Sequence, residues 1–407
     1  MNRMQPSRYP LLSVQAALDL VLASTAPLDT ELVALADAFG RVLAEPIVSD
    51  ADLPPFATTA VDGYAVVAGD VAAWRAIVAE VTAGNADAVA IHPGIAARIM
   101  TGAPLPTGTD AVVMVEQTVE ENGRVRLQQP VAPGENIHPV GLDLRVGQRV
   151  LDRGQELGAP EIGLLATLGL HTVPVYRKPR VAVLATGDEL VDYREAPGPG
   201  AIRDSNRPSL LAAVVEAGGE PISLGIGQDD EAEQTRIILD GLARADVLVT
   251  SGGVSVGSRD LIKPIFEQLG QVHVGRVAIK PGKPFTFATI GGKLAFGLPG
   301  FPVSTLVTFE VFVRPALRRL AGREVIQRPR VEVVLEDSAR PAPDRTEYQR
   351  AVVRWLDGQL MARTTGAQVS SRLLSMIGAN GLIIIEPGES ELPAGTVVPA
   401  LLTGEMR

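Results

Sequence analysis

The spacing of apolar residues changes its period several times along the chain. Residues 13–24 carry apolar side chains on one helical stripe behind a potential cap at Ser13, which predicts an amphipathic helix. A second helix is predicted over residues 28–44, ending before Pro46. Residues 61–129 instead carry short β-type runs separated by glycine and proline, which predicts a small β-rich domain.

From residue 180 onward, short apolar strands alternate with helical segments. The strands are expected at residues 181–185, 221–226, 247–250 and 293–296 and near Val277, and the helices at residues 209–217, 230–243, 259–269 and 303–320. Such alternation is typical of βα units, so it predicts an α/β domain with a doubly wound parallel sheet. After Gly322 the pattern returns to β-type runs, which predicts a C-terminal β domain.

These changes of pattern divide the chain into four predicted parts. Residues 1–50 and 140–178 form a linker domain of helical and extended segments, and residues 51–139 form the β-rich domain that precedes the sheet. Residues 179–326 form the α/β domain, and residues 327–407 form the C-terminal β domain. A length of 407 residues with 46% hydrophobic content is enough for several cores.

The composition argues against several classes of protein. The formal net charge of −10 argues against nucleic acid as a partner, so an anionic ligand would need a local site. The chain has no cysteine, which excludes disulfides and thiol nucleophiles, and its four histidines are scattered. No segment has the pattern of a signal peptide or a membrane span, so a cytoplasmic protein without a membrane partner is expected.

Three turns rich in glycine, proline, serine or lysine follow apolar runs in the predicted α/β domain. They contain Ser251-Gly252-Gly253, Lys280 to Lys283, and Pro299-Gly300. Glycine lets an anion approach backbone N–H groups closely, and lysine neutralises its charge. The chain has only five lysines among 37 basic residues, yet two of them lie in one four-residue turn. We therefore expect a phosphate site; the alternative is a solvated loop.

Acidic residues also follow strands of the predicted α/β domain. Asp188 and Glu189 come after the first strand of the α/β domain, Asp229 comes after the second, and Asp260 closes the glycine-rich turn. Loops of parallel strands emerge on one side of a sheet, where carboxylates mixed with lysines suit a phosphate bridged by Mg²⁺. The alternative for each carboxylate, including the neighbouring Asp230, is a helix N-cap. The chain has neither a Walker lysine motif nor G-x-G-x-x-G.

Polar turns also occur outside the α/β domain. Asp62-Gly63 and residues 101–110 are dense in turn residues, and taken alone they favour ordinary hairpins. Residues 345–350 and 370–372 offer groups that could bind an anion, and the alternative for them is ordinary surface polarity.

Taken together, these runs resemble the molybdopterin molybdenumtransferase family, which includes MoeA and the E domain of gephyrin. The matching runs are VDGYAV (61–66), TGAPLPTGTDAVV (101–113), GENIHPVGLD (134–143), ATGDEL (185–190), IRDSNRPSL (202–210), SGGVSVGSRD (251–260), KPGKPFTF (280–287), GLPGFPVS (297–304) and SSRLLSMIGANGL (370–382). The chain departs from the family at residues 58–61, where Ser-Ala-Met is more common before the aspartate.

The resemblance implies an enzyme that converts adenylylated molybdopterin and molybdate into molybdenum cofactor and AMP with Mg²⁺. It also implies an elongated homodimer in which the β-rich domain of one subunit faces the α/β domain of the other. The catalytic residues would be Asp62, Thr101, Glu189, Asp229 and Asp260, of which Glu189 and Asp260 would bind the metal. The resemblance and the three turns described above together give the expected substrate-binding residues. These are Asp143, Asp188, Ser251, Gly252, Gly253, Lys280, Lys283, Pro299, Gly300, Arg350 and Ser371, or Ser370 in place of Ser371.

Three other functions stay open at this point. A molybdopterin adenylyltransferase would share the α/β domain, but its turn resembles Gly-Gly-Thr-Gly, whereas here Gly253 is followed by Val-Ser-Val-Gly. A non-catalytic scaffold on the same fold would be expected to lack the carboxylates, and a phosphosugar or nucleotide enzyme would be expected to carry a phosphate motif. Further partners to consider are a molybdopterin adenylyltransferase and molybdoenzyme chaperones.

Overall fold

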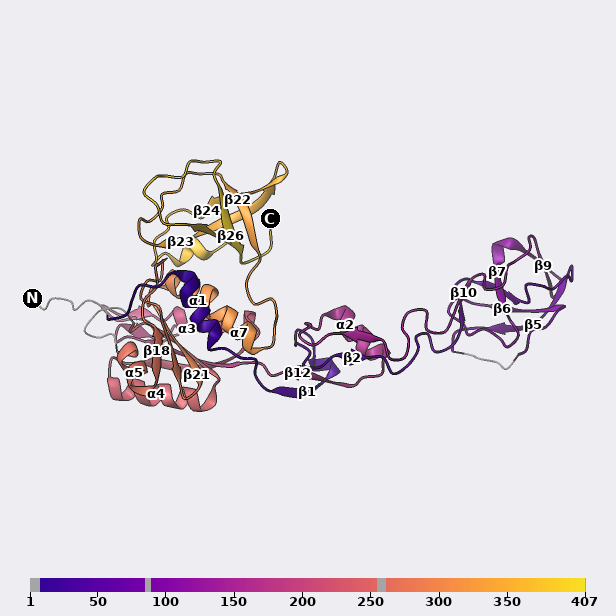
Figure 1. The fold of residues 1–407 in the computed structure, drawn as a ribbon, viewed down its shortest axis with the longest axis horizontal. Coiled ribbons are helices and arrows are strands. Elements are labelled where there is room, and N and C mark those ends of the chain that lie inside the picture. Colours follow the sequence, from indigo (N-terminus) through magenta and orange to yellow (C-terminus); the bar gives the residue numbers. More distant parts are fainter. Residues whose placement is uncertain (1–7, 85–88, 255–260, 407) are drawn as a thin grey trace, which may run out of the picture. The chain divides into compact units, whose positions relative to one another are not determined.

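The computed structural model describes residues 8–84, 89–254 and 261–406. The chain forms two compact units, whose elements are shown in Figure 1. The first unit contains Met1–Ala44, Gly154–Gly158 and Thr172–Arg407, and the second contains Glu45–Arg153 and Ala159–His171. The finer division into four domains stays a prediction.

The centre of the first unit is a six-stranded sheet in the order β16-β13-β17-β21-β20-β18. Its strands are β13 (Arg180–Thr186), β16 (Glu220–Gly227), β17 (Val247–Ser251), β18 (Gln271–Val274), β20 (Thr286–Ile290) and β21 (Lys293–Leu298). β16, β13, β17 and β21 are parallel, as predicted, whereas β20 runs antiparallel to both of its neighbours. The sequence interpretation missed β20, although Gly291-Gly292 before β21 is a hairpin signal.

Helices cover both faces of this sheet (Figure 1). One face packs against α1 (Val14–Ala23), α3 (Asn206–Glu216), α6 (Pro302–Thr308) and α7 (Arg314–Leu320), and the other against α4 (Glu231–Arg244) and α5 (Ile262–Leu269). Along β13, Val181 and Val183 face the first group and Ala182 and Leu184 face the second, because successive side chains of a strand point to opposite faces. The doubly wound fold predicted from the sequence is therefore confirmed.

The helix predicted over residues 303–320 corresponds to α6, the π-helical segment Phe309–Val313 and α7 in direct succession. At the N-terminal end of α1, the Oγ of Ser13 accepts a hydrogen bond from the N–H of Ala16 at 3.1 Å, so the predicted cap is present. No helix in the described part of the chain is long and apolar enough to cross a membrane.

A closed ring of five strands forms the C-terminal part of the first unit. These strands are β22 (Arg330–Leu335), β23 (Thr346–Leu356), β24 (Gln359–Thr364), β25 (Gly381–Ile385) and β26 (Val397–Leu402). The strand predicted near Val277 is β19 (Ile279–Lys280), which pairs with β23 and not with the α/β sheet. Tyr348 and Leu382 join the apolar core of the α/β sheet, so the ring packs directly against that domain.

The second unit is β-rich, as predicted. Its main sheet has the order β7-β4-β6-β5-β9-β8, with β4 (Gly63–Val66), β5 (Arg75–Val81), β6 (Ile95–Ile99), β7 (Ala111–Met114), β8 (Thr118–Glu121) and β9 (Arg124–Leu127). Two short pairs and a helix complete it: β2 (Ile47–Val48) with β11 (Arg149–Leu151), β3 (Thr58–Thr59) with β10 (Ile137–His138), and α2 (Ala159–Thr167).

The helix predicted over residues 28–44 is wrong. Thr30–Ala34 forms β1, which pairs antiparallel with β12 (Thr172–Tyr176), and a 3₁₀ turn follows at Leu35–Asp37. Leu32 and Phe39, which a helix would have placed on an apolar stripe, are 72% and 73% exposed. Pairing with a strand about 140 residues away outweighs the local spacing, because propensity is a weak prior against tertiary contacts.

Candidate functional site

The carboxyl ends of the parallel strands open onto one edge of the sheet in the first unit. The loops that continue from β13, β16, β17 and β21 carry the predicted residues Asp188, Glu189, Asp229, Gly252, Gly253, Pro299 and Gly300. Because β20 is antiparallel and begins with Thr286 opposite Gly297, the loop before it reaches the same edge. Lys283 lies in that loop, and Lys280 is the last residue of β19 just before it, so the structure brings these predicted residues to one side of the sheet.

Close packing requires a glycine at the turn after β17. The N–H of Gly252 donates to the carbonyl oxygen of Leu298 at 3.0 Å, and its φ of +96° lies in the left-handed region. A Cβ at this position would lie 2.5 Å from the carbonyl oxygen of Thr186, so any side chain would collide with β13. The described part of the turn ends at Val254, and the predicted residue Asp260 lies outside the described residues.

Asp188 connects the loops that follow β13 and β16. Its Oδ1 accepts a hydrogen bond from the N–H of Asp229 at 2.9 Å, which brings the two predicted residues together. The carboxylate of Glu189 folds over Gly187, where an added Cβ would lie 2.5 Å from its Oε2. Asp230 instead caps α4, because its side chain accepts from the N–H of Glu233 at 2.8 Å.

The two lysines of the 280–283 turn meet different surroundings. Lys280 Nζ lies 3.1 Å from Oε1 of Glu347, a carboxylate that is nearly fully buried and whose Oε2 has no partner among the described atoms. Lys283 is exposed, and its carbonyl oxygen accepts from the N–H of Val277, which fixes the backbone of the turn. No ion pair holds Lys283 within the described residues, although its positive charge is among the causes that lower the pKa of Asp344.

Arg350 holds the segment around Ser370 in place through hydrogen bonds. It is fully buried, and its guanidinium donates from Nε to Ser375 Oγ at 3.1 Å and from Nη2 to the carbonyl oxygen of Val369 at 3.3 Å. Burial lowers the pKa of Arg350, an effect that the charge of Glu347 opposes. The segment fixed in this way contains Ser370, whose carbonyl oxygen accepts from the N–H of Val303 at 3.1 Å. Ser370 therefore lies beside Val303, at the start of α6 and three residues after Gly300.

In the second unit, Asp62 and Thr101 form a direct pair. Gly63 pairs with Ile99 across β4 and β6, which places Asp62 next to the residues that follow β6. Oδ1 of Asp62 accepts from the N–H of Thr101 at 2.6 Å and from its Oγ1 at 2.7 Å, and these bonds lower the pKa of Asp62. Asp143 lies in the loop between β10 and β11, where its N–H donates to the carbonyl oxygen of Leu53 at 2.9 Å. No hydrogen bond among the described residues joins Asp143 to the pair.

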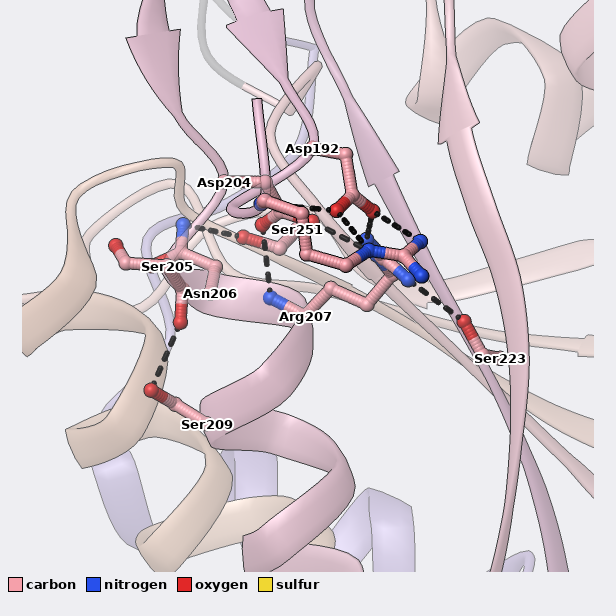
Figure 2. A network of polar contacts seen from close by, with 9 residues as sticks. Asp192, Asp204, Ser205, Asn206, Arg207, Ser209, Ser223 and Ser251 are labelled. Atoms are coloured by element: carbon pink, nitrogen blue, oxygen red, sulfur yellow. Dashed lines mark hydrogen bonds and ion pairs between the residues drawn. The ribbon is translucent and has the colours of Figure 1, made fainter. Parts of the chain in front are cut away.

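The sequence interpretation missed the first turn of α3, where two consecutive side chains organise the edge (Figure 2). Arg207 donates to Asp204 Oδ2 at 2.8 Å, to Asp192 Oδ2 at 2.8 Å and to Ser223 Oγ at 3.0 Å. Bonds from Arg194 and Arg207 hold the pKa of Asp192 far below its usual range. Arg207 thereby fixes β14 (Leu190–Val191), which follows Glu189 directly, and its paired strand β15 (Ile202–Arg203).

Asn206 is the second missed residue. Its Nδ2 donates to Ser251 Oγ at 2.8 Å and to the carbonyl oxygen of Gly300 at 2.7 Å, so it connects the turns after β17 and β21. An open hollow of about 400 Å³ lies along the neighbouring loops, and its lining includes Leu190, Arg194 and Gln228. The run IRDSNRPSL carried the signal, but the predicted helix began at Ser209, whereas α3 begins at Asn206.

A doubly wound domain with glycine turns, carboxylates and lysines at one sheet edge is typical of the class of α/β proteins that bind phosphate-bearing ligands. Comparison with known families is more specific. Residues 12–169 match the MoeA N-terminal region (domains I and II), residues 182–319 match a probable molybdopterin binding domain, and residues 332–403 match the MoeA C-terminal region (domain IV). The chain belongs to the molybdopterin molybdenumtransferase family.

Relatives match over most of the chain. It is 36% identical to the molybdopterin molybdenumtransferase of Haemophilus influenzae, in a match that covers 91% of this chain and 93% of that protein. It is 38% identical to the molybdopterin molybdenumtransferase of a Nostoc species, in a match that covers 92% of this chain and 88% of that protein. It is 36% identical to gephyrin of Dictyostelium discoideum over 98% of its length, but it spans 63% of gephyrin. A solved molybdopterin biosynthesis MoeA protein from Pyrococcus horikosii has a TM-score of 0.84 at 33% identity, covering 97% of this chain and all of the other.

Proposed function

We propose that the chain transfers molybdenum from molybdate to adenylylated molybdopterin and releases AMP. The observation that carries this proposal is the convergence of glycine turns, lysines and carboxylates on one sheet edge in the domain that matches a molybdopterin-binding family. The relatives named molybdopterin molybdenumtransferase support the metal and the pterin, and the sheet edge supports a substrate that carries phosphate.

The residues at this edge suit cleavage of a phosphoanhydride, in which a water oxygen forms the new P–O bond as AMP leaves. The oxygen that molybdate loses to the dithiolene sulfurs leaves as water with the thiol protons. Cleavage of the anhydride requires that charge on the phosphate oxygens is neutralised, which Lys283, Lys280 and the backbone N–H groups of the glycine turns provide. The dithiolene of the substrate supplies the sulfur ligands for molybdenum, so no protein thiol is needed, in a chain without cysteine. The role of the protein is to position molybdate beside that dithiolene.

Mg²⁺ is part of the proposal. Within the described residues, no group of three or more histidine or acidic side chains gathers as a closed metal site. Mg²⁺ commonly takes one or two carboxylates and completes its shell with water and substrate phosphate. Glu189 and Asp260 are the proposed ligands, because both offer hard carboxylate oxygens; Asp260 lies outside the described residues. When bound, Mg²⁺ would neutralise charge on the phosphate oxygens.

Substitution of the carboxylates tests this proposal. Glu189→Gln and Asp260→Asn should abolish AMP release that depends on molybdate while the melting temperature stays unchanged. Asp240→Asn is a matched control, because Asp240 is an exposed carboxylate of α4 paired with Arg244. Turnover that is unchanged in folded Glu189→Gln and Asp260→Asn proteins would remove both residues from the reaction.

A further inference from the structure

Asn206 occupies a position at the sheet edge that the proposed reaction does not yet use. It is the first residue of α3, and its side chain contacts Ser251 at the carboxyl end of β17 (Figure 2). It also contacts Gly300, which follows β21. Its Nδ2 lies 2.8 Å from Ser251 Oγ and 2.7 Å from the carbonyl oxygen of Gly300. Both partners belong to turns that were identified from the sequence as parts of the anion site.

Gly300 fixes the orientation of the Asn206 amide. A carbonyl oxygen only accepts hydrogen bonds, so the atom of Asn206 that faces it must be the amide nitrogen and not the amide oxygen. The same nitrogen faces Ser251 Oγ, and an amide nitrogen only donates. Ser251 Oγ therefore accepts from Asn206, and the hydroxyl hydrogen of Ser251 must point in another direction.

The hydroxyl hydrogen of Ser251 has no acceptor among residues 8–84, 89–254 and 261–406. Ser251 is only 2% exposed and directly precedes Gly252, whose turn touches that of Gly300. A buried hydroxyl group without an acceptor is costly, and an oxygen of a bound anion would satisfy it. The geometry thus offers a donor at the glycine turns whose direction is set by its neighbour.

We propose that Asn206 is a positioning residue that holds the Ser251 hydroxyl as a hydrogen-bond donor to a tetrahedral oxyanion at this edge. The proposal rests on the proposed function, which provides two such anions, the phosphate of AMP and molybdate. Aspartate at this position would accept from Ser251, turn the hydroxyl hydrogen inward and add a repelling charge. Asparagine is therefore required for its donor group, and not only for its size.

Binding of the two anions to the full chain provides the test. Titration calorimetry would measure the Kd of AMP and of molybdate for the wild type, Ser251→Ala, Asn206→Ala, Asn206→Asp and the double variant Asn206→Ala/Ser251→Ala. Ser209→Ala is the matched control, because Ser209 Oγ donates to the carbonyl oxygen of Ser205 in the same turn of α3 (Figure 2). Asn206→Asp keeps the shape of the side chain, so the comparison does not depend on whether Asn206→Ala folds.

We expect Ser251→Ala and Asn206→Asp to raise the Kd of one of the two anions about tenfold or more. Asn206→Ala should raise the same Kd severalfold, and Ser209→Ala should leave both Kd values unchanged. The anion affected identifies the ligand of Ser251. In the double variant, the loss should equal that of Ser251→Ala alone, because Asn206 acts through Ser251.

Three results would overturn the inference. Additive losses in the double variant would mean that Asn206 only holds the two turns together. Unchanged Kd values for Asn206→Asp would mean that the direction of the Ser251 hydroxyl has no role in anion binding. If that variant still releases AMP, the proposed function is unaffected by this result. A wild type that binds neither anion would reject the inference and the anion site together.

Discussion

At the scale of single residues, the surroundings of Lys280 and Lys283 separate their roles. Lys280 faces the buried carboxylate of Glu347, so its charge is shared between the protein and any ligand. Lys283 is exposed and has no such partner within the described residues. Lys283 is therefore the better single probe of anion binding, since its removal leaves no buried charge behind.

Lys283→Ala should weaken binding of AMP about tenfold or more, because a hydrogen bond to a charged group contributes about 1.5–3 kcal/mol. Lys178→Ala is the control: Lys178 precedes β13, and so lies toward the amino ends of the parallel strands. Titration calorimetry checks the prediction. Equal losses for the two variants would favour the solvated-loop interpretation of the turn.

The sequence identified residue types at this site better than it identified their surroundings. Lys283, Glu189 and Gly252 could be named because their chemistry is visible in local runs. The support role of Arg350 could not be predicted, because its burial depends on the packing of residues 369–375 against a distant strand. Asn206 was missed because it was taken for a residue before the helix, and its partners lie 45 and 94 positions away.

At the scale of elements, Asp246 connects the starts of β13 and β17. Its carboxylate accepts from both terminal nitrogens of Arg177 at 2.8 and 3.0 Å, and from the N–H of Arg180 at 2.8 Å. Burial raises the pKa of Asp246, but these bonds outweigh burial and lower the pKa overall. The opposite end of the same strands carries the candidate site, so this anchor helps to fix the edge.

Asp246→Asn should lower the free energy of unfolding at pH 7 by about 1–3 kcal/mol. The folded pKa lies below the unfolded value of about 3.9, so the stabilisation is fully present above that value and is lost as the pH falls through the folded pKa. Urea unfolding at several pH values checks this, with the exposed Asp240→Asn as control. A difference from the wild type that stays constant down to the lowest pH would contradict the role of the carboxylate.

Local pattern predicted most helices and parallel strands but failed where distant pairing decides the structure. The βα alternation correctly predicted β13, β16, β17 and β21, because buried parallel strands are continuous apolar runs. It failed at Thr30–Ala34, which becomes a strand only through its pairing with β12. It also assigned residues near Val277 to the wrong sheet, since β19 is held by β23 of the C-terminal ring.

At the scale of the whole molecule, the candidate residues are divided between the two units. Asp62, Thr101 and Asp143 belong to the second unit, and all the others belong to the first. The homodimer implied by the family resemblance stays a prediction, and it offers a way for both sets to act on one substrate.

Mixed dimers test this prediction. An Asp62→Ala subunit and an Asp260→Ala subunit, each inactive alone, should together regain up to about half of the activity of a wild-type dimer, because one of the two sites then receives both intact residues. Differently tagged subunits purified in two steps would provide the mixed dimers for the assay. If these dimers form and stay inactive, the two sets of residues do not act across subunits.

The most direct test of the central claim is release of AMP from adenylylated molybdopterin by the purified chain, with and without molybdate. With Mg²⁺ present, AMP release should depend on molybdate and should be accompanied by a pterin product that contains molybdenum. AMP release at the same rate without molybdate, or no release under either condition, would contradict the assignment of molybdenum transfer to this chain.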